Sequence, residues 1–349
     1  MKRILRFGLY AIQNLHYYMD KGFFSLYLRK AADLMKQIDV RKGRIPEDII
    51  ANCPRSLIIN NRFLPGIRID FFTEDKNIDL IILYRKHRIL NNMSIKGTST
   101  LEITVTDRHG NKQRFELCPK TSTQMSVRRS ILLKESGNEV SALLPGFAMV
   151  DSIWLQNAGD IQFRKNNRKT IAFYGSSITH GCAASKPSLS YPNLLGELTG
   201  YHIENFGFSE SAKGEPEVIR YIASLKPEVL ILEFDHNASV KELEARHLDT
   251  YRLIRRDSDC WIIFMSRFSG GLSISEEEEQ ERIHIISSTY YFARKHNDRK
   301  VAFLPGNTVF GKDKDRYFID GVHPNDDGMK MIADAIYKIM KDSGMIEPC

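Results

Sequence analysis

The second half of the chain alternates between short apolar segments and amphipathic ones, and this alternation limits the fold more than any other sequence feature. The apolar segments are rich in β-branched residues, as buried strands are, whereas the amphipathic segments repeat at helical spacing. The predicted strands are 170–174, 202–206, 229–234, 261–265 and 301–304, and the predicted helices are 191–198, 216–224, 240–255, 276–295 and 325–340. This order predicts an α/β fold with a mainly parallel sheet covered by helices on both faces. Motifs at the carboxyl ends of its strands carry the greatest weight for function.

The preceding region has a different pattern, with short turn-bounded strands and no helices between them. The predicted strands are 56–63, 66–73, 77–87, 101–107 and 112–118, and ITVTDRHGNKQRFEL predicts a hairpin that turns at residues 108–111. Such a series predicts an antiparallel sandwich or barrel. A chain of 349 residues favours two domains. We place the β-sandwich domain at 51–165, the α/β domain at 166–349 and a linker at 157–168.

Residues 1–50 form a predicted N-terminal helical segment, because apolar residues recur at helical spacing between residues 7 and 36. Its aromatic side chains leave three docking partners open, namely a membrane, a partner subunit or the body of the same chain, of which we favour the last. An oligomer through residues 1–50 therefore stays open. The initial apolar stretch is interrupted by polar residues, and no run approaches the roughly 20 apolar residues of a membrane span. We expect a cytoplasmic protein without membrane insertion.

Composition argues against several classes of protein. The 50 Lys and Arg residues exceed the 43 Asp and Glu residues by 7, but no clustered aromatics accompany them, so we expect no nucleic-acid partner. Five widely spaced cysteines indicate neither a disulfide framework nor a CxxC metal site. Histidines and acidic residues show no metal-ligand spacing either, and we expect no metal and no cofactor.

One polar run, YGSSITHG at 174–181, directly follows the first predicted strand of the α/β half. A hydroxyl at a strand-to-helix junction is exposed at the edge of the sheet, where free backbone N–H groups can receive a developing negative charge. Gly175 permits a sharp turn there. The run differs from the G-x-S-x-G elbow because Thr179 replaces the second glycine. A Gly-Ser-Ser run alone is usually only a turn, so Ser177 is a candidate nucleophile only in combination with other motifs.

A second polar run, DGVHPN at 320–325, immediately precedes the last predicted helix. A serine nucleophile needs a base, and the imidazole that serves as base needs an acceptor to fix its tautomer. Asp320 and His323 supply both from one loop. Separately, Asp320 could form a turn and Asn325 could cap the helix. The joint occurrence of the two runs favours Ser177, His323 and Asp320 as a catalytic triad.

Two further runs, NFGFS at 205–209 and EFDHN at 233–237, end the intervening strands. The backbone N–H of Gly207 and the side-chain amide of Asn237 can donate to one oxyanion beside Ser177. Loss of one such donor typically raises the barrier by about 3–4 kcal/mol. Taken singly, Gly207 is a tight turn and Asn237 is a helix cap.

The four runs, in this order and at these strand ends, resemble the SGNH hydrolases, also called GDSL-type esterases, over residues 170–342. The resemblance carries the family's Ser, Gly, Asn and His onto Ser177, Gly207, Asn237 and His323. It implies that Asp320 orients the histidine and that the Ser177 N–H joins the oxyanion hole. YGSSIT, NFGFS and DGVHP are most similar to the subgroup with a β-sandwich domain before the catalytic one. The implied fold is a flavodoxin-like three-layer α/β/α catalytic domain preceded by an antiparallel, jelly-roll-like sandwich.

The sequence departs from the family pattern at two positions. Ser176 stands where an Asp usually precedes the nucleophile, which removes a charge that often braces the oxyanion loop. Glu210 lies where the family often has more glycine, and it could restrict the choice of substrate. His180 and His236 flank the candidate residues and are further candidates for substrate contact, although a structural histidine is the commoner case. Cys182 has no activating base and is predicted to be a small packed residue.

Three functional hypotheses follow. The leading one is a serine esterase that hydrolyses a short acyl ester, by resemblance acetyl on a carbohydrate, so that its partner is a small-molecule or glycan ester. The second uses the same triad to transfer the acyl group to a sugar hydroxyl. The third is a non-catalytic glycan-binding protein whose β domain recognises the ligand.

Overall fold

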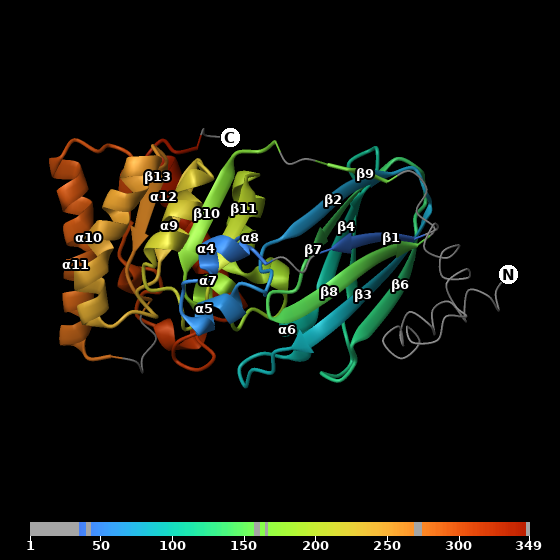
Figure 1. Cartoon of the computed structure of the whole chain (residues 1–349), viewed down its shortest axis with the longest axis horizontal. Helices are drawn as coiled ribbons and strands as arrows, with labels where there is room; N and C mark the ends of the chain where they lie inside the picture. Colours follow the sequence, from blue (N-terminus) through green and yellow to red (C-terminus); the bar gives the residue numbers. More distant parts are fainter. Residues whose placement is uncertain (1–34, 40–42, 157–160, 165–166, 269–273, 347–349) are drawn as a thin grey trace.

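The protein combines one parallel sheet covered by helices with two antiparallel sheets (Figure 1). The computed structural model describes residues 35–39, 43–156, 161–164, 167–268 and 274–346. The parallel sheet and its helices are drawn at one end of the molecule in Figure 1, and the antiparallel sheets lie at the other end.

The parallel sheet has the strand order β11-β10-β12-β13-β14. Its strands are β10 (Thr170–Gly175), β11 (His202–Gly207), β12 (Val229–Glu233), β13 (Trp261–Met265) and β14 (Val301–Leu304). All neighbouring pairs run parallel, and the second strand in the chain lies outside the first, which is the flavodoxin-like order. The predicted α/β fold class is confirmed.

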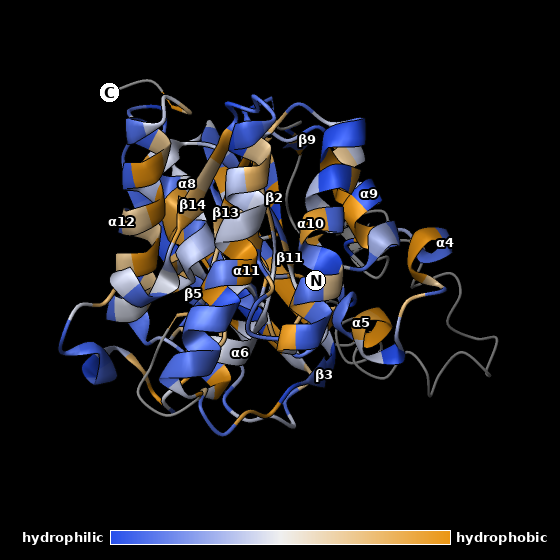
Figure 2. Cartoon of the chain, turned by 90° about the vertical axis from the view of Figure 1, so that its left-hand side faces the viewer, coloured by the Kyte–Doolittle hydropathy of each residue, from blue (hydrophilic) through white to orange (hydrophobic). Residues whose placement is uncertain are grey.

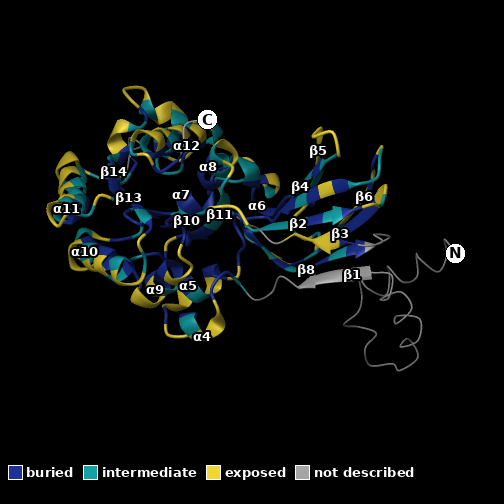
Figure 3. Ribbon diagram, turned by 90° about the horizontal axis from the view of Figure 1, so that it is seen from above, coloured by how far each residue is buried: buried dark blue, intermediate teal, exposed yellow. Residues whose placement is uncertain are grey.

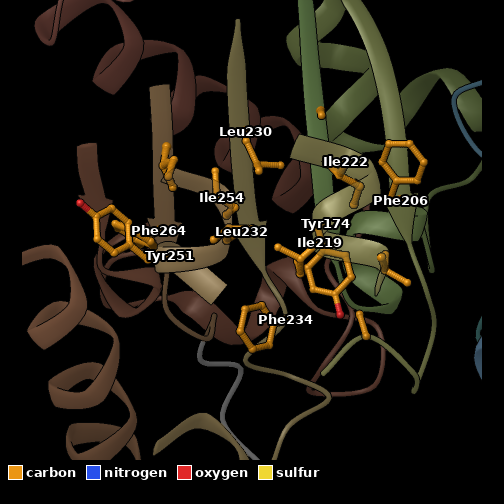
Figure 4. Close-up of a cluster of buried hydrophobic side chains, with 14 of the residues drawn as sticks. Tyr174, Phe206, Ile219, Ile222, Leu230, Leu232, Phe234, Tyr251, Ile254 and Phe264 are labelled. Carbon is orange, nitrogen blue, oxygen red and sulfur yellow. The ribbon is translucent and has the colours of Figure 1, made fainter. Parts of the chain in front are cut away.

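Helices cover both faces of this sheet because its strands are apolar on both sides (Figures 2 and 3). The helices are α7 (Ser177–His180), α8 (Tyr191–Thr199), α9 (Pro216–Ser224), α10 (Val240–Asp257), α11 (Glu276–Lys295) and α12 (Asp326–Asp342), with 3-10 turns η1 (Pro187–Leu189), η2 (Gly306–Thr308) and η3 (Lys314–Tyr317). In β10, Ala172 and Tyr174 face the core formed with α9, α10 and α11, part of which Figure 4 shows. Ile171 and Phe173 face the core formed with α8 and α12.

The two antiparallel sheets pack face to face around a third core, which confirms the predicted β-sandwich. Their strand orders are β1-β8-β3-β6 and β5-β4-β7-β2-β9. The strands are β1 (Met35–Asp39), β2 (Arg68–Thr73), β3 (Asn77–His87), β4 (Leu101–Thr106), β5 (Lys112–Leu117), β6 (Ser126–Leu132), β7 (Asn138–Leu143), β8 (Ala148–Gln156) and β9 (Gln162–Phe163), and the short helix α6 spans Ile95–Ser99. In β4 the alternate residues Leu101, Ile103 and Val105 are buried, as a half-buried strand requires.

The strand predicted at 56–63 is wrong, because this segment contains the helix α5 (Arg55–Asn60), which follows α4 (Glu47–Ile50). A short apolar run does not distinguish strand from helix, and Pro54 directly precedes the helix with a φ of −53°. Ile50 and Leu57 lie in the core shared with α9, and Figure 1 shows both short helices beside the parallel sheet. We propose that residues 45–57 belong to the α/β domain, so that no domain boundary falls at residue 51.

Part of the predicted N-terminal helical segment is also wrong, because Met35–Asp39 forms β1, which pairs antiparallel with β8. Tertiary pairing overrides a helical apolar spacing there. Residues 1–34 lie outside the described residues, and the oligomer contact through residues 1–50 stays a prediction. In the predicted linker, β9 pairs with β2, whereas residues 157–160 and 165–166 are not described. Among the described helices, none combines the length and apolar character that crossing a membrane requires.

Candidate active site

Ser177 is the first residue of α7 and lies at the carboxyl end of β10, at the edge of the parallel sheet. Its Oγ is 2.8 Å from Nε2 of His323, which is within hydrogen-bond distance. The backbone N–H of Ser177 has no acceptor among the described residues. Gly175 is required at the preceding turn because a Cβ there would lie 2.2 Å from Oγ1 of Thr179. Close packing, rather than an unusual φ, therefore explains this glycine.

His323 and Asp320 lie in a tight loop before α12, closed by a backbone bond from Ile319 N to the His323 carbonyl of 3.0 Å. Nδ1 of His323 is 2.8 Å from Oδ2 of Asp320, and the His323 backbone N–H donates to Oδ1 at 2.8 Å. Partial burial opposes ionisation of Asp320, but these bonds from His323 and one from Asn92 outweigh it and lower its pKa to about 2. The carboxylate is thus charged near neutral pH and holds the imidazole with Nε2 toward Ser177.

Glu233 supplies a buried carboxyl group to the turn that carries Ser177. Ser176, whose side chain caps α7, donates to Oε2 of Glu233 from its backbone N–H at 3.1 Å and from Oγ at 2.8 Å. Thr179 Oγ1 donates to the same oxygen at 2.6 Å. Burial raises the pKa of Glu233 to about 7, although these hydrogen bonds oppose the rise. The neighbouring strand β12 therefore supplies the carboxyl group that position 176 lacks, and this group is neutral below about pH 7 and charged above it.

Gly207 is not placed as the sequence suggested, because its N–H donates to Oδ1 of Asn205 at 2.8 Å. A Cβ at this position would lie 2.3 Å from the backbone nitrogen of His180, so the glycine serves close packing between β11 and α7. Asn237 lies in the turn that follows β12, and its Nδ2 donates to the Phe208 carbonyl at 2.9 Å. An amide nitrogen carries two hydrogens, so one of them is left for a ligand.

Glu210 lies in the turn after β11 and has a φ of +61°. Its side chain is 86% exposed and faces the guanidinium of Arg88 at 3.9 Å. An exposed pair of this kind contributes little to stability. The Glu210 backbone N–H has no acceptor among the described residues.

The side chains of the two flanking histidines contact protein groups, and their suggested role in substrate contact stays a prediction. His180 is buried, stacks on Phe147 with ring centroids 4.1 Å apart, and pairs through Nε2 with the Gly146 carbonyl at 2.7 Å. His236 stacks on Phe268, and its Nε2 accepts a hydrogen bond from the backbone N–H of Phe268 at 3.1 Å. Burial lowers the pKa of both imidazoles well below the ordinary value, so both are neutral.

Sequence reasoning missed Asn92, which belongs to the β-sandwich region and contacts the loop of Asp320. No local pattern announces it, because its partner lies 228 residues away. Cys182 is buried beside Asn92, and burial raises the pKa of its thiol to about 11. Among the described residues, no group of three or more His, Cys, Asp and Glu side chains is arranged to hold a metal ion.

Residues 168–341 match the model of a family described as GDSL-like lipase/acylhydrolase. Through this domain, the chain belongs to the GDSL-like lipase/acylhydrolase family. Its enzyme class is therefore carboxylic ester hydrolase, and members of the family act on esters by hydrolysis or acyl transfer. A comparison with curated protein sequences found no match.

Three solved structures share the fold of this GDSL-like protein along most of its length. A candidate GDSL-like lipase from Bacteroides ovatus has 21% identity and a TM-score of 0.77 over 90% of this chain and 99% of its own. The salicylyl-acyltransferase SsfX3 from a tetracycline biosynthetic pathway has 17% identity and a TM-score of 0.70 over 89% and 95%. A family two carbohydrate esterase from Clostridium thermocellum has 14% identity and a TM-score of 0.55 over 81% and 94%. These likenesses extend through both the sandwich and the parallel sheet.

Proposed function

We propose that this GDSL-like protein is a serine esterase that removes a short acyl group, acetyl in the simplest case, from a carbohydrate. The observation that carries the proposal is the chain of contacts from Ser177 Oγ to His323 Nε2 and from His323 Nδ1 to Asp320, each 2.8 Å long. A neutral imidazole that is hydrogen-bonded to a charged carboxylate can take the serine proton as the hydroxyl attacks.

The proposed reaction has two steps. Ser177 Oγ attacks the ester carbonyl while its proton passes to Nε2 of His323, and the imidazolium then gives this proton to the departing sugar oxygen. Water loses a proton to His323 as it attacks the acyl-enzyme. The bond between the acyl carbon and Ser177 Oγ then breaks, the imidazolium returns the proton to Oγ, and the carboxylic acid leaves. The oxyanion of each step is stabilised by the Ser177 N–H and by the second N–H of the Asn237 amide.

A third oxyanion donor comes from the turn after β11 in this proposal. The Gly207 N–H is occupied by Asn205, whereas the Glu210 N–H has no acceptor among the described residues. Asn237 binds the Phe208 carbonyl in the same turn, which links this segment to the site. We therefore assign the third donor to Glu210 rather than to Gly207.

Two observations support a carbohydrate as the alcohol partner. In this proposal Arg88 and Glu210, whose side chains face each other at 3.9 Å, provide a cation and an exposed anion for hydrogen bonds with sugar hydroxyls. The similar structure from Clostridium thermocellum is that of a carbohydrate esterase, described in complex with cellohexaose.

Acyl transfer is a second candidate, because the similar structure SsfX3, with a TM-score of 0.70, is described as an acyltransferase. The same acyl-enzyme would then react with a sugar hydroxyl in place of water. Product analysis with and without an acceptor sugar distinguishes the two, since only transfer yields an acylated acceptor. The complete hydrogen-bonded triad argues against the third hypothesis, a non-catalytic glycan-binding protein.

The test compares Ser177→Ala with Ser288→Ala, a control at an exposed position of α11. We expect Ser177→Ala to lose turnover of nitrophenyl acetate at an unchanged melting temperature, while Ser288→Ala retains it. Equal turnover by both variants would refute the proposed nucleophile.

A further inference from the structure

Asn92 lies in a turn that extends from the β-sandwich toward the loop of Asp320. The turn is closed by a backbone bond from Met93 N to the Leu90 carbonyl of 3.3 Å. Directly after it, Ser94 caps α6 by accepting a bond from the Gly97 N–H. A Cβ on Gly97 would lie 2.7 Å from the Ala184 carbonyl, so α6 packs against the loop that follows α7. Asn92 thus lies in a hydrogen-bonded turn that is followed directly by a capped and packed helix.

The amide of Asn92 and the imidazole of His323 share one acceptor. Nδ2 of Asn92 donates to Oδ2 of Asp320 at 2.8 Å, and Nδ1 of His323 is also 2.8 Å from this oxygen. The two nitrogens are 3.2 Å apart, but the acceptor role of Nε2 toward Ser177 requires the proton on Nδ1. Both nitrogens are therefore donors, and their contact is the consequence of a common acceptor rather than a bond.

The chemistry of the neighbours fixes the orientation of this amide. Nδ2 and Oδ1 lie 3.5 and 3.7 Å from Sγ of Cys182, so the thiol does not distinguish the two orientations, whereas the Asp320 carboxylate requires a donor. A reversed amide would direct its oxygen at the Asp320 carboxylate and lose the bond. Among the described residues, Asp320 accepts bonds at Oδ1 from the backbone N–H groups of Val322 and His323, and these come from its own loop. Asn92 supplies the donor from outside that loop.

We propose that Asn92 is a positioning residue for the reaction, which fixes the Asp320 carboxylate so that its Oδ2 stays directed at Nδ1 of His323. The inference rests on the proposed triad. The side chain of Asp320 is 36% exposed, so water competes for its oxygens wherever the protein does not supply a donor. The GDSL-like domain thus depends on the sandwich domain for the geometry of its acid and base, and correct packing of the two domains is a condition of full activity.

Substitution of Asn92 should change both kcat and the pH dependence of kcat/KM, and a loss of packing alone would not change the pH dependence. Asn92→Ala lets water bind Oδ2 and lets the carboxylate turn, which should lower kcat about tenfold or more with little change in KM, because a hydrogen bond to a charged group is lost. Asn92→Asp instead puts a second negative charge beside the imidazole. This charge favours the imidazolium, so the acid limb of the kcat/KM profile should move upward by about one pH unit.

Other titratable groups near the site are common to the wild type and the variants, so comparison with the wild type removes their contributions. One of them is Glu233, whose pKa burial raises to about 7. Burial keeps His236 neutral and raises the pKa of the Cys182 thiol to about 11. In the wild type, Asp320 has a pKa of about 2 and stays ionised across the acid limb. In Asn92→Asp, repulsion between the two neighbouring carboxylates further favours proton uptake at this site, in the same direction as the expected shift. The difference between Asn92→Asp and the wild type can therefore be assigned to the charge added beside His323.

The experiment uses the full chain and nitrophenyl acetate, with Asn91→Ala and Asn91→Asp as matched controls, because Asn91 is the exposed neighbour in the same turn. We expect lower kcat for both Asn92 variants, an upward shift of the acid limb for Asn92→Asp, and wild-type behaviour for both Asn91 variants. If Asn92→Ala fails to fold, Asn92→Asp, which is nearly the same size, decides by the shift alone.

Two results would overturn the assignment. One is wild-type kcat and an unmoved acid limb in both Asn92 variants. The other is an equal loss of kcat in both with the acid limb of Asn92→Asp unmoved, which a merely structural role would produce. Activity that survives Ser177→Ala would instead refute the proposed function itself, so the two failures are distinguishable.

Discussion

Glu233→Gln should remove a pH dependence of folding stability that originates under the nucleophile turn. The carboxyl group is 1% exposed, and burial raises its pKa from 4.5 to about 7. A glutamine has nearly the same shape, can accept the bonds from Ser176 and Thr179, and cannot ionise. The variant therefore changes the titration while retaining most of the contacts.

The magnitude follows from the two pKa values. Between pH 4.5 and about 7 the folded protein holds the Glu233 proton that the unfolded chain has released, so the free energy of unfolding falls as the pH rises through this range. A shift of about 2.5 pH units at 1.36 kcal/mol per unit gives about 3 kcal/mol, fully present as a destabilisation above pH 7. Relative to the wild type, Glu233→Gln should gain about 3 kcal/mol between about pH 4 and about pH 8.

Urea unfolding at about pH 4, 6 and 8 measures this difference, and the contributions of the other carboxyl groups cancel between the two proteins. Glu244→Gln is the matched control, because Glu244 is exposed on α10 and should leave the pH dependence unchanged. A difference between wild type and Glu233→Gln that stays constant across the three pH values would refute the reasoning.

Two further substitutions test the packing around the site. Arg282→Ala should lower the free energy of unfolding by about 3–5 kcal/mol, because Arg282 pairs with buried Asp235 at 2.8 Å and also donates to the Ala238 carbonyl; a loss below about 1 kcal/mol in urea would contradict this. Gly207→Ala should lower it by about 2 kcal/mol or more, because the new Cβ would overlap the His180 backbone. An unchanged unfolding midpoint for Gly207→Ala would show that this contact can relax.

The elements that local periodicity determines could be predicted from the sequence. The bounds of β13 and α11 coincide with those expected, since an unbroken apolar run and a long helical spacing are local signals. The strand predicted at 56–63 was wrong because a short apolar run fits a strand or a helix equally well. Packing on the parallel sheet favours the helix.

The candidate site could be predicted as far as its signals are local. Asp320 and His323 are three residues apart in one loop, and this short separation already favours their pairing. The role of Glu233 depends on the pairing of β10 with β12, which places Glu233 opposite Gly175. The contact of Asn92 with Asp320 depends on the packing of two domains, and no spacing along the chain encodes it. The sequence did not reveal that Asn205, only two residues before Gly207, accepts the Gly207 N–H in an Asx-type turn, which is why we propose Glu210 as the third donor in its place.

The central claim is that Ser177 carries the acyl group. Its most direct test is to mix the protein with nitrophenyl acetate, quench in acid within the first turnover, and locate the added acetyl group by peptide mass mapping. We predict one acetyl group per chain on the peptide that contains Ser177, and none at this position in Ser177→Ala or after exposure to acetate alone. An acetyl group that accumulates with turnover kinetics on another residue, while Ser177 stays unmodified, would contradict the account.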